Sequence, residues 1–224
     1  MTSIPPNIYI IGAQSTGKTT LVNALAASAD HLPPSTRPSI ISEVARAVLA
    51  KHDFRAHDIR ASHQRCSALQ MLILKAQHDQ EQEALRTNSW FISDRSGLDP
   101  LVYAERHVSP AFARTMMRTP EWQSLRSSLA RSLIVVCEPV RGWLVDDGVR
   151  LMPADDEDWR DYHRRFCSCL DALGLEYRLL PSIKPHLEWR VRHVWEAWRV
   201  RAAQTDDGHA PETCRSHEFP PGPR

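Results

Sequence analysis

Hydrophobic residues fall into two kinds of segment along the chain. Short continuous apolar runs, such as those in NIYIIG and SLIVVCEP, are typical of buried parallel strands, whereas apolar residues three or four positions apart are typical of helices. The two kinds alternate from residue 7 to about residue 203. This alternation predicts an α/β fold in which crossover helices join the strands of one sheet.

The pattern assigns most of the chain to particular elements. Strands are expected in NIYIIG, in IIS before Glu43, in SWFISD up to Asp94, and in SLIVVCEP and EYRLLP. Helices are expected over residues 18–29, from Glu43 onward, and over 59–86, 98–130, 157–173 and 186–203. Pro110 and Pro120 interrupt the stretch 98–130, whereas the segment 59–86 has no Pro or Gly and is predicted to form one long helix.

Composition and charge fit an ordinary globular protein. The chain has 224 residues, of which 42% are hydrophobic, and 28 Lys and Arg balance 27 Asp and Glu. A balanced charge gives no electrostatic reason to expect nucleic acid or a membrane surface as the main partner, and no run approaches the roughly 18 apolar residues of a membrane span. We expect one domain over residues 1–203 and a disordered tail, rich in Pro and Gly, over 204–224.

The cysteines bear on the cellular compartment. The chain has five of them, an odd and scattered set, and the first residues lack the charged segment of a secretory signal. We therefore expect reduced thiols and a cytoplasmic protein. Cys167 and Cys169 form a CxC pair on different faces of an expected helix, so a metal site there is not favoured.

A phosphate-binding loop follows the first expected strand. The segment GAQSTGKTT satisfies the Walker A pattern G-x-x-x-x-G-K-[ST], and it stands between an expected strand and an expected helix, as the motif requires. Its glycines let successive N–H groups converge on phosphate oxygens, the lysine reaches the β- and γ-phosphates, and the following threonine ligates Mg²⁺. The expected nucleotide-binding residues are Gly12, Ala13, Gln14, Ser15, Thr16, Gly17, Lys18, Thr19 and Thr20.

Two carboxylates stand at the ends of expected strands. Asp94 ends the run WFISD, where it would hold Mg²⁺ together with Thr19 or accept a proton from an attacking hydroxyl; otherwise it caps the next helix. Glu43 ends the run before SEVAR, where it would face an acceptor as hydrogen-bond partner or general base, or pair with Arg46 one turn later. Spacing alone leaves both alternatives for Glu43 open.

Two arginines complete the candidate catalytic set of Lys18, Glu43, Asp94, Arg95 and Arg150. Arg95 would reach a phosphate or brace the sheet, and the neighbouring Asp99 is expected to be structural. Arg150 lies in the polar segment DDGVR, which suits a mobile lid that brings positive charge to the transferred phosphoryl group.

These motifs occur in an order that resembles a known family. The segments GAQSTGKTTLVNAL, SEVAR, a long Gln-rich helix, FISDRSGLDPLVYA and DDGVR resemble the AAA-type P-loop family related to the nicotinamide riboside kinase domain of NadR. The resemblance covers residues 7 to 200 and implies a kinase-like, doubly wound parallel sheet with a Mg²⁺–nucleotide cleft. SEVAR and DRS are also similar to the acidic motifs of deoxynucleoside kinases, which implies that Glu43 serves the acceptor and Asp94 and Arg95 serve the metal and the phosphate.

Two functions are consistent with these features. The first is an ATP-dependent kinase, with GTP as a possible donor, that phosphorylates a nucleoside-like or other small metabolite; two separate carboxylates and a lid arginine favour it. The second is a nucleotide-binding regulator or slow NTPase that acts on a protein partner. No N-K-x-D motif for guanine follows the fourth expected strand.

Overall fold

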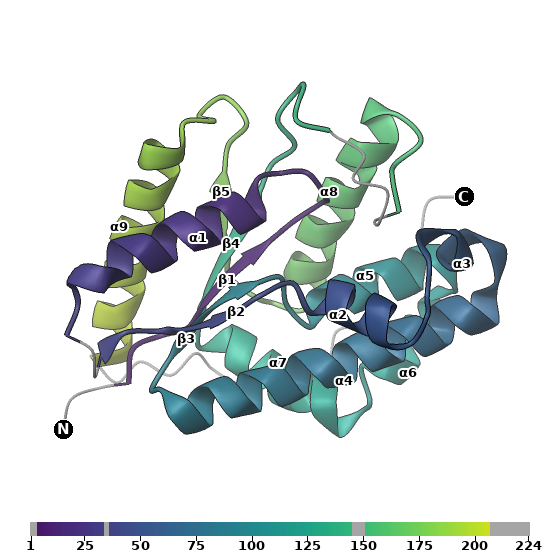
Figure 1. Cartoon of the computed structure of the whole chain (residues 1–224), viewed down its shortest axis with the longest axis horizontal. Helices are drawn as coiled ribbons and strands as arrows, with labels where there is room; N and C mark the ends of the chain where they lie inside the picture. Colours follow the sequence, from purple (N-terminus) through teal and green to yellow (C-terminus); the bar gives the residue numbers. More distant parts are fainter. Residues whose placement is uncertain (1–3, 34–35, 145–150, 207–224) are drawn as a thin grey trace.

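The computed structural model describes residues 4–33, 36–144 and 151–206. At its centre lies a sheet of five parallel strands in the order β2-β3-β1-β4-β5 (Figure 1). Every residue of β1, β3 and β4 is buried, which explains why these inner strands read as nearly continuous apolar runs. The strands are β1 (Ile8–Ile11), β2 (Ser39–Ile41), β3 (Phe91–Asp94), β4 (Leu133–Cys137) and β5 (Arg178–Leu180).

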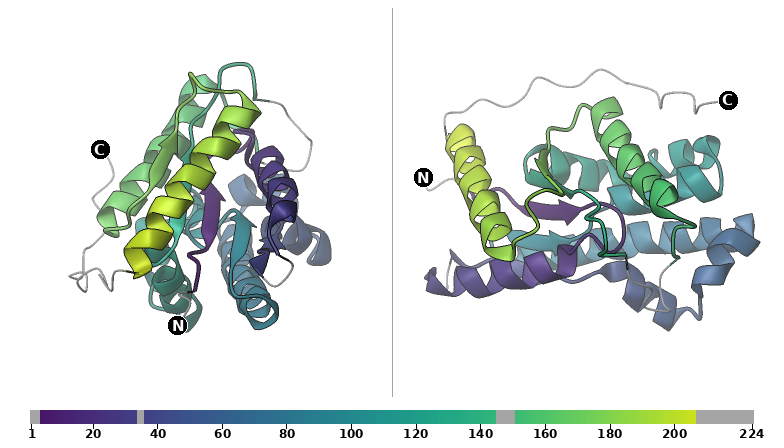
Figure 2. Two further views of the ribbon diagram at one scale, coloured as in Figure 1. Left: turned by 90° about the vertical axis from the view of Figure 1, so that its left-hand side faces the viewer. Right: turned by 90° about the horizontal axis from the view of Figure 1, so that it is seen from above.

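Helices cover both faces of the sheet (Figure 2). Side chains of β1 alternate between the faces: Ile8 and Ile10 pack with α1 and α9, whereas Tyr9 and Ile11 pack with α4, α5, α7 and α8. The helices are α1 (Lys18–Ser28), α2 (Val44–Lys51), α3 (Ala56–Ala61), α4 (His63–Thr87), α5 (Leu98–His107), α6 (Pro110–Met116), α7 (Pro120–Ala130), α8 (Asp156–Ala172) and α9 (Leu187–Asp206), with a short 3₁₀ helix, η1 (Ala29–His31). The doubly wound parallel sheet predicted from the sequence is confirmed.

One predicted helix is wrong. The segment 59–86 was expected to be continuous, but α3 ends at Ala61 and α4 begins at His63. Ser62 between them is extended, with φ −148° and ψ 113°, and its hydroxyl accepts a hydrogen bond from Arg65 N. A serine N-cap therefore breaks the helix where neither Pro nor Gly marks the break.

The prolines act as predicted. Pro110 and Pro120 are the first residues of α6 and α7, where a missing N–H costs nothing, and Ser109 and Thr119 cap these helices.

Near the C-terminus, α9 continues to Asp206, past the expected boundary at residue 203, and residues 207–224 lie outside the described part. Within the described residues, no helix has the length and apolar character of a membrane span.

The connectivity places a crevice above β1. From β1 the chain first builds β2 and β3 on one side and then crosses to β4 and β5 on the other. The carboxyl end of β1 is therefore the topological switch point, which is where open α/β sheets bind ligands.

Candidate active site

The loop between β1 and α1 has the backbone that the Walker A pattern predicts. Gly12 and Gly17 have φ values of 129° and 76°, and a Cβ at Gly12 would lie 2.7 Å from the carbonyl oxygen of Cys137. Neither position tolerates a side chain without strain, because both have a backbone conformation that favours glycine and both have close neighbours, β4 at Gly12 and the Trp143 and Arg190 side chains at Gly17. The loop leads directly into α1, so the helix N-terminus adds partial positive charge at the same place.

Lys18 is buried at the start of α1. Its Nζ donates to Ala13 O at 2.5 Å and to Thr16 Oγ1 at 3.3 Å, both within the loop. Burial, and secondarily the nearby Arg95 charge, lower the pKa of Lys18 to about 8, against the opposing influence of Asp94. The ammonium group therefore lies at the phosphate site with neutral oxygens as its hydrogen-bond acceptors.

Asp94 and Thr19 lie together beside the loop. Asp94 ends β3 in register with Ile10 of β1, and its Oδ2 accepts a 2.5 Å hydrogen bond from Thr19 Oγ1. Its other oxygen, Oδ1, is buried and has no hydrogen-bond partner among the described residues. A buried carboxylate oxygen without a donor, next to a threonine hydroxyl, fits the oxygen ligands that Mg²⁺ prefers. Asp94 does not cap α5: within the segment that precedes that helix, Ser96 Oγ accepts from Leu98 N.

Arg95 braces two carboxylates. Its Nε donates to Glu43 Oε1 at 2.7 Å and its Nη1 donates to Asp99 Oδ1 at 2.9 Å. Burial opposes the charge, but the two carboxylates outweigh it and raise the pKa of Arg95. Its backbone has φ 86°, a conformation rare outside glycine, and its N–H donates to Ile10 O. Such strain is stored where a side chain must be aimed at a site.

Glu43 pairs with Arg46, which is one of the two alternatives that spacing left open, and also with Arg95. It precedes α2 and accepts hydrogen bonds from Arg95 and, at 2.9 Å, from Arg46 Nε. Asp99, which was expected to be structural, also pairs with Arg95 and faces the same space; burial raises its pKa, and Arg95 opposes that shift. The structure therefore brings three acidic side chains, Glu43, Asp94 and Asp99, around Arg95 and the phosphate loop.

A cleft opens next to these residues. Its empty volume is about 670 Å³, open solvent included. Apolar residues of α2, α3 and α4 form much of it, and Gln70, Gln77 and Tyr103 add polar groups. The stretch 56–70 and the segment LVYAERH of α5 both contribute to it. The lining residues are Glu43, Val44, Ala45, Arg46, Leu49, Ile59, Leu69, Gln70, Ile73, Gln77, Arg95, Ser96, Asp99, Pro100, Tyr103 and Leu151.

One residue at the loop escaped the sequence analysis. Arg190 of α9 is buried, and its Nη2 donates to Thr16 O at 3.1 Å while its guanidinium lies 5.5 Å from the centre of the Trp143 ring. Nothing in the sequence distinguished it from the other arginines of this helix. Gln14 was predicted to bind nucleotide, but the contacts of its side chain were not foreseen. Arg150 lies outside the described residues.

Comparisons with known proteins support this fold. NadR in complex with NR superposes with a TM-score of 0.63 at 19% identity, over 95% of this chain and 54% of that chain. NadR in complex with NAD and AMP-PNP superposes with a TM-score of 0.60 at 18% identity, over 95% of this chain and 52% of that chain. Deoxyadenosine kinase from M. mycoides with bound dATP superposes with a TM-score of 0.58 at 10% identity, over 87% of this chain and 99% of that chain. The chain thus spans about half the length of the NadR chains.

No curated protein matches the chain. Identities this low show the fold alone, and that fold is the kinase-like P-loop fold expected from the sequence. A family model described as an AAA domain matches residues 7–190, which includes the phosphate loop, both strand-end carboxylates and the start of α9. The chain belongs to this AAA domain family of P-loop proteins.

Proposed function

We propose that the chain is an ATP-dependent kinase that transfers the γ-phosphate to a hydroxyl of a nucleoside-like or other small metabolite. The observation that carries this proposal is the cleft lined by Glu43, Arg95 and Asp99, which lies directly beside the phosphate loop and Asp94. A nucleotide switch needs a loop and one carboxylate near the metal, whereas a separate cleft that also carries acidic groups suits a second substrate.

The residues divide into a donor side and an acceptor side. On the donor side, loop N–H groups and Lys18 bind the phosphates, and Thr19 with Asp94 would hold Mg²⁺. Bound there, Mg²⁺ neutralises charge on the phosphate oxygens. On the acceptor side, Glu43 would hydrogen-bond the attacking hydroxyl or remove its proton, and Arg95 holds that carboxylate in place. Arg150 would add positive charge from the lid, as the sequence predicts.

The nature of the cleft supports a nucleoside-like acceptor. Its walls are mainly apolar, which suits a flat ring, and the Gln70 amide offers hydrogen bonds to a polar ring edge. Two of the similar structures contain ligands of this class, NR in NadR and dATP in deoxyadenosine kinase.

The test is ADP release from Mg-ATP, and GDP release from Mg-GTP, with and without nucleosides, nicotinamide riboside and small polyols. Lys18→Ala provides the blank. Glu43→Gln should lower acceptor-dependent release at least about a hundredfold, the lower end of what general base catalysis contributes. Glu83→Gln is the matched control, because Glu83 is also paired with an arginine but lies on the exposed face of α4.

A phosphorylated acceptor detected by mass spectrometry would establish the kinase. Slow release that is indifferent to every acceptor would overturn it and favour the nucleotide-dependent regulator that acts through a protein partner. Equal loss of activity in Glu43→Gln and Glu83→Gln would remove the role assigned to Glu43.

A further inference from the structure

Gln14 makes contacts that a phosphate loop does not require. The loop binds phosphate through backbone N–H groups, so side chains at its variable positions are free to face solvent. Gln14 is instead fully buried, with a relative exposure of 0%. A buried amide must be hydrogen-bonded, and the partners of Gln14 lie far away in the sequence.

Each polar group of Gln14 reaches a different part of the fold. Its Nε2 donates to Leu151 O at 3.0 Å, and its Oε1 accepts a 3.4 Å hydrogen bond from the Tyr103 hydroxyl of α5. Its backbone carbonyl accepts from Trp159 Nε1 of α8 at 2.7 Å. The loop is therefore tied through one residue to α5, to α8 and to the segment that leads into α8.

Two of these partners also form the proposed acceptor cleft. Tyr103 and Leu151 both line it, alongside Glu43 and Arg95. Leu151 is 6% exposed, so its side chain belongs to the wall and not to the surface. A molecule in the cleft thus touches the same two residues that hold the side chain of Gln14.

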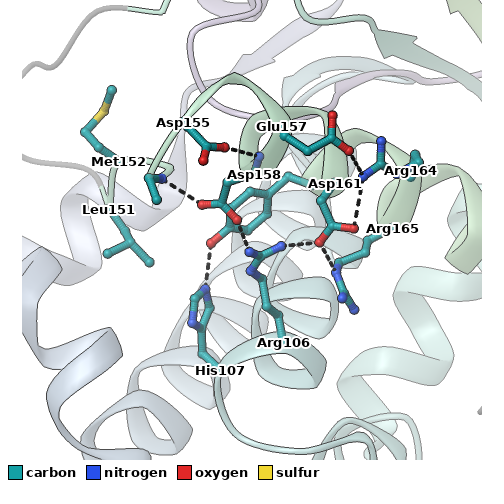
Figure 3. Close-up of polar contacts among 12 residues, drawn as sticks. Arg106, His107, Leu151, Met152, Asp155, Glu157, Asp158, Asp161, Arg164 and Arg165 are labelled. Atoms are coloured by element: carbon teal, nitrogen blue, oxygen red, sulfur yellow. Dashed lines mark hydrogen bonds and ion pairs between the residues drawn. The ribbon is translucent and has the colours of Figure 1, made fainter. Parts of the chain in front are cut away.

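The segment 151–155 is fixed on its far side as well (Figure 3). Arg60 Nη2 donates to Met152 O at 2.8 Å, and Ala154 N donates to Asp158 Oδ2 at 2.8 Å. Arg106 of α5 lies between the carboxylates of Asp158 and Asp161 and pairs with both. These contacts tie the segment to α3 and α8, and Arg106 ties α8 to α5, so the segment is a structural link between cleft and loop.

We propose that Gln14 is a positioning residue that couples acceptor binding to nucleotide binding. A ligand that orders Tyr103 and Leu151 in the cleft also orders Gln14, and with it the loop backbone that receives the phosphates. Because such coupling is reciprocal, bound nucleotide strengthens acceptor binding by the same factor. This inference rests on the proposed function, since it takes the cleft to be the acceptor site.

The neighbouring peptide group explains how the coupling reaches Lys18. Lys18 Nζ donates to the carbonyl of Ala13, which belongs to the same peptide unit as the N–H of Gln14. The Lys18 ammonium has three N–H donors, so it can add a phosphate oxygen to this contact or exchange the contact for one. The anchors of Gln14 hold the residue that completes this peptide unit, so they help to position the carbonyl that Lys18 contacts.

The experiment measures the Kd of Mg-AMP-PNP by calorimetry, alone and with saturating nicotinamide riboside or deoxyadenosine as the probe. Gln14→Leu removes both side-chain hydrogen bonds at similar volume, and Tyr103→Phe removes one while keeping the ring in the wall. Tyr177→Phe is the matched control, because that hydroxyl interacts with Cys167 and Asp171, away from the cleft. Thermal unfolding shows whether each variant is folded. If Gln14→Leu does not fold, Tyr103→Phe still tests the inference.

In the wild-type protein the probe should tighten AMP-PNP binding at least about fivefold, the lower end of typical coupling. Gln14→Leu should bring that ratio close to one, Tyr103→Phe should at least halve it, and Tyr177→Phe should leave it unchanged. A ratio of one in the wild type, or an unchanged ratio in both cleft-side variants, overturns the inference. The proposed function is judged separately by phosphorylated product from Mg-ATP, so transfer without coupling would leave the kinase standing.

Discussion

Glu81 offers a quantitative test of the packing beneath the site. This residue of α4 is 1% exposed, its Oε2 accepts a 2.6 Å hydrogen bond from the Tyr9 hydroxyl of β1, and its Oε1 accepts a 2.9 Å bond from Gln77 Nε2. Burial raises the pKa of Glu81 from 4.5 to about 7, although both hydrogen bonds favour the charged form. The perturbation is Glu81→Gln, which removes the titration and keeps the shape.

The shift of the Glu81 pKa fixes both the sign and the size of the effect. Between pH 4.5 and 7 the folded protein holds this proton more tightly than the unfolded chain, so the free energy of unfolding falls as pH rises through that window. The difference of about 2.5 pKa units corresponds to a loss of about 3 kcal/mol in the free energy of unfolding. This loss is complete above pH 7 and absent below pH 4.5. Glu81→Gln should lack this decline.

The assay is urea unfolding of both proteins at intervals from pH 4.5 to 8.5. The wild-type protein should lose about 3 kcal/mol relative to Glu81→Gln across this range, whatever constant offset the amide introduces. Glu83→Gln on the exposed face of the same helix is the control, because burial does not govern its titration. A difference between wild type and Glu81→Gln that does not change with pH would refute the reasoning.

Three further predictions concern the site itself. The pKa of Lys18 is lowered to about 8 and its charged form binds phosphate, so the affinity for AMP-PNP should fall as pH rises from 7 to 9.5. Lys18→Arg should abolish this dependence, because arginine stays charged throughout this range. Calorimetry at each pH checks both expectations. Asp94→Asn should raise the Mg²⁺ concentration needed for half-maximal nucleotide binding at least about tenfold, and an unchanged requirement would exclude Asp94 as the metal ligand. Arg95→Met should lower the free energy of unfolding by about 3–5 kcal/mol in urea, because it removes the guanidinium that pairs with the buried Glu43 and Asp99 carboxylates; a loss below about 1 kcal/mol would contradict this role of Arg95.

The sequence predicted the phosphate loop, the inner strands and the proline-started helices, because these depend on residues that lie close together in the chain. The phosphate loop was found from glycines whose unusual φ values are confirmed, and the inner strands were found because burial on both faces makes them apolar throughout. The helices at Pro110 and Pro120 follow from the chemistry of proline itself. The break at Ser62 was missed because a serine cap depends on where the neighbouring helix must turn, and periodicity does not record that.

Contacts between distant residues could not be read from the same patterns. Arg190 reaches Thr16 from α9, and Gln14 is held by Leu151, Tyr103 and Trp159, yet no spacing rule connects these positions. Asp99 looked structural because it precedes a proline; its place in the cleft follows from the way α5 packs against α4. Pairings of this kind arise from tertiary packing, so they emerge only when the sheet and its helices are assembled.

Arg95 and Lys18 differ in how strongly their present partners hold them, and this decides which of the two can move with a phosphate group. The Arg95 guanidinium lies 2.7 Å from Glu43 and 2.9 Å from Asp99, and in a buried place such pairs are costly to separate. The oxygens that Lys18 contacts, Ala13 O and Thr16 Oγ1, are neutral, and exchanging them costs about 1 kcal/mol each. Of these two cations, Lys18 is therefore the one that can move with a phosphate group. Arg95 stays in place, where its guanidinium fixes the Glu43 carboxylate beside the cleft.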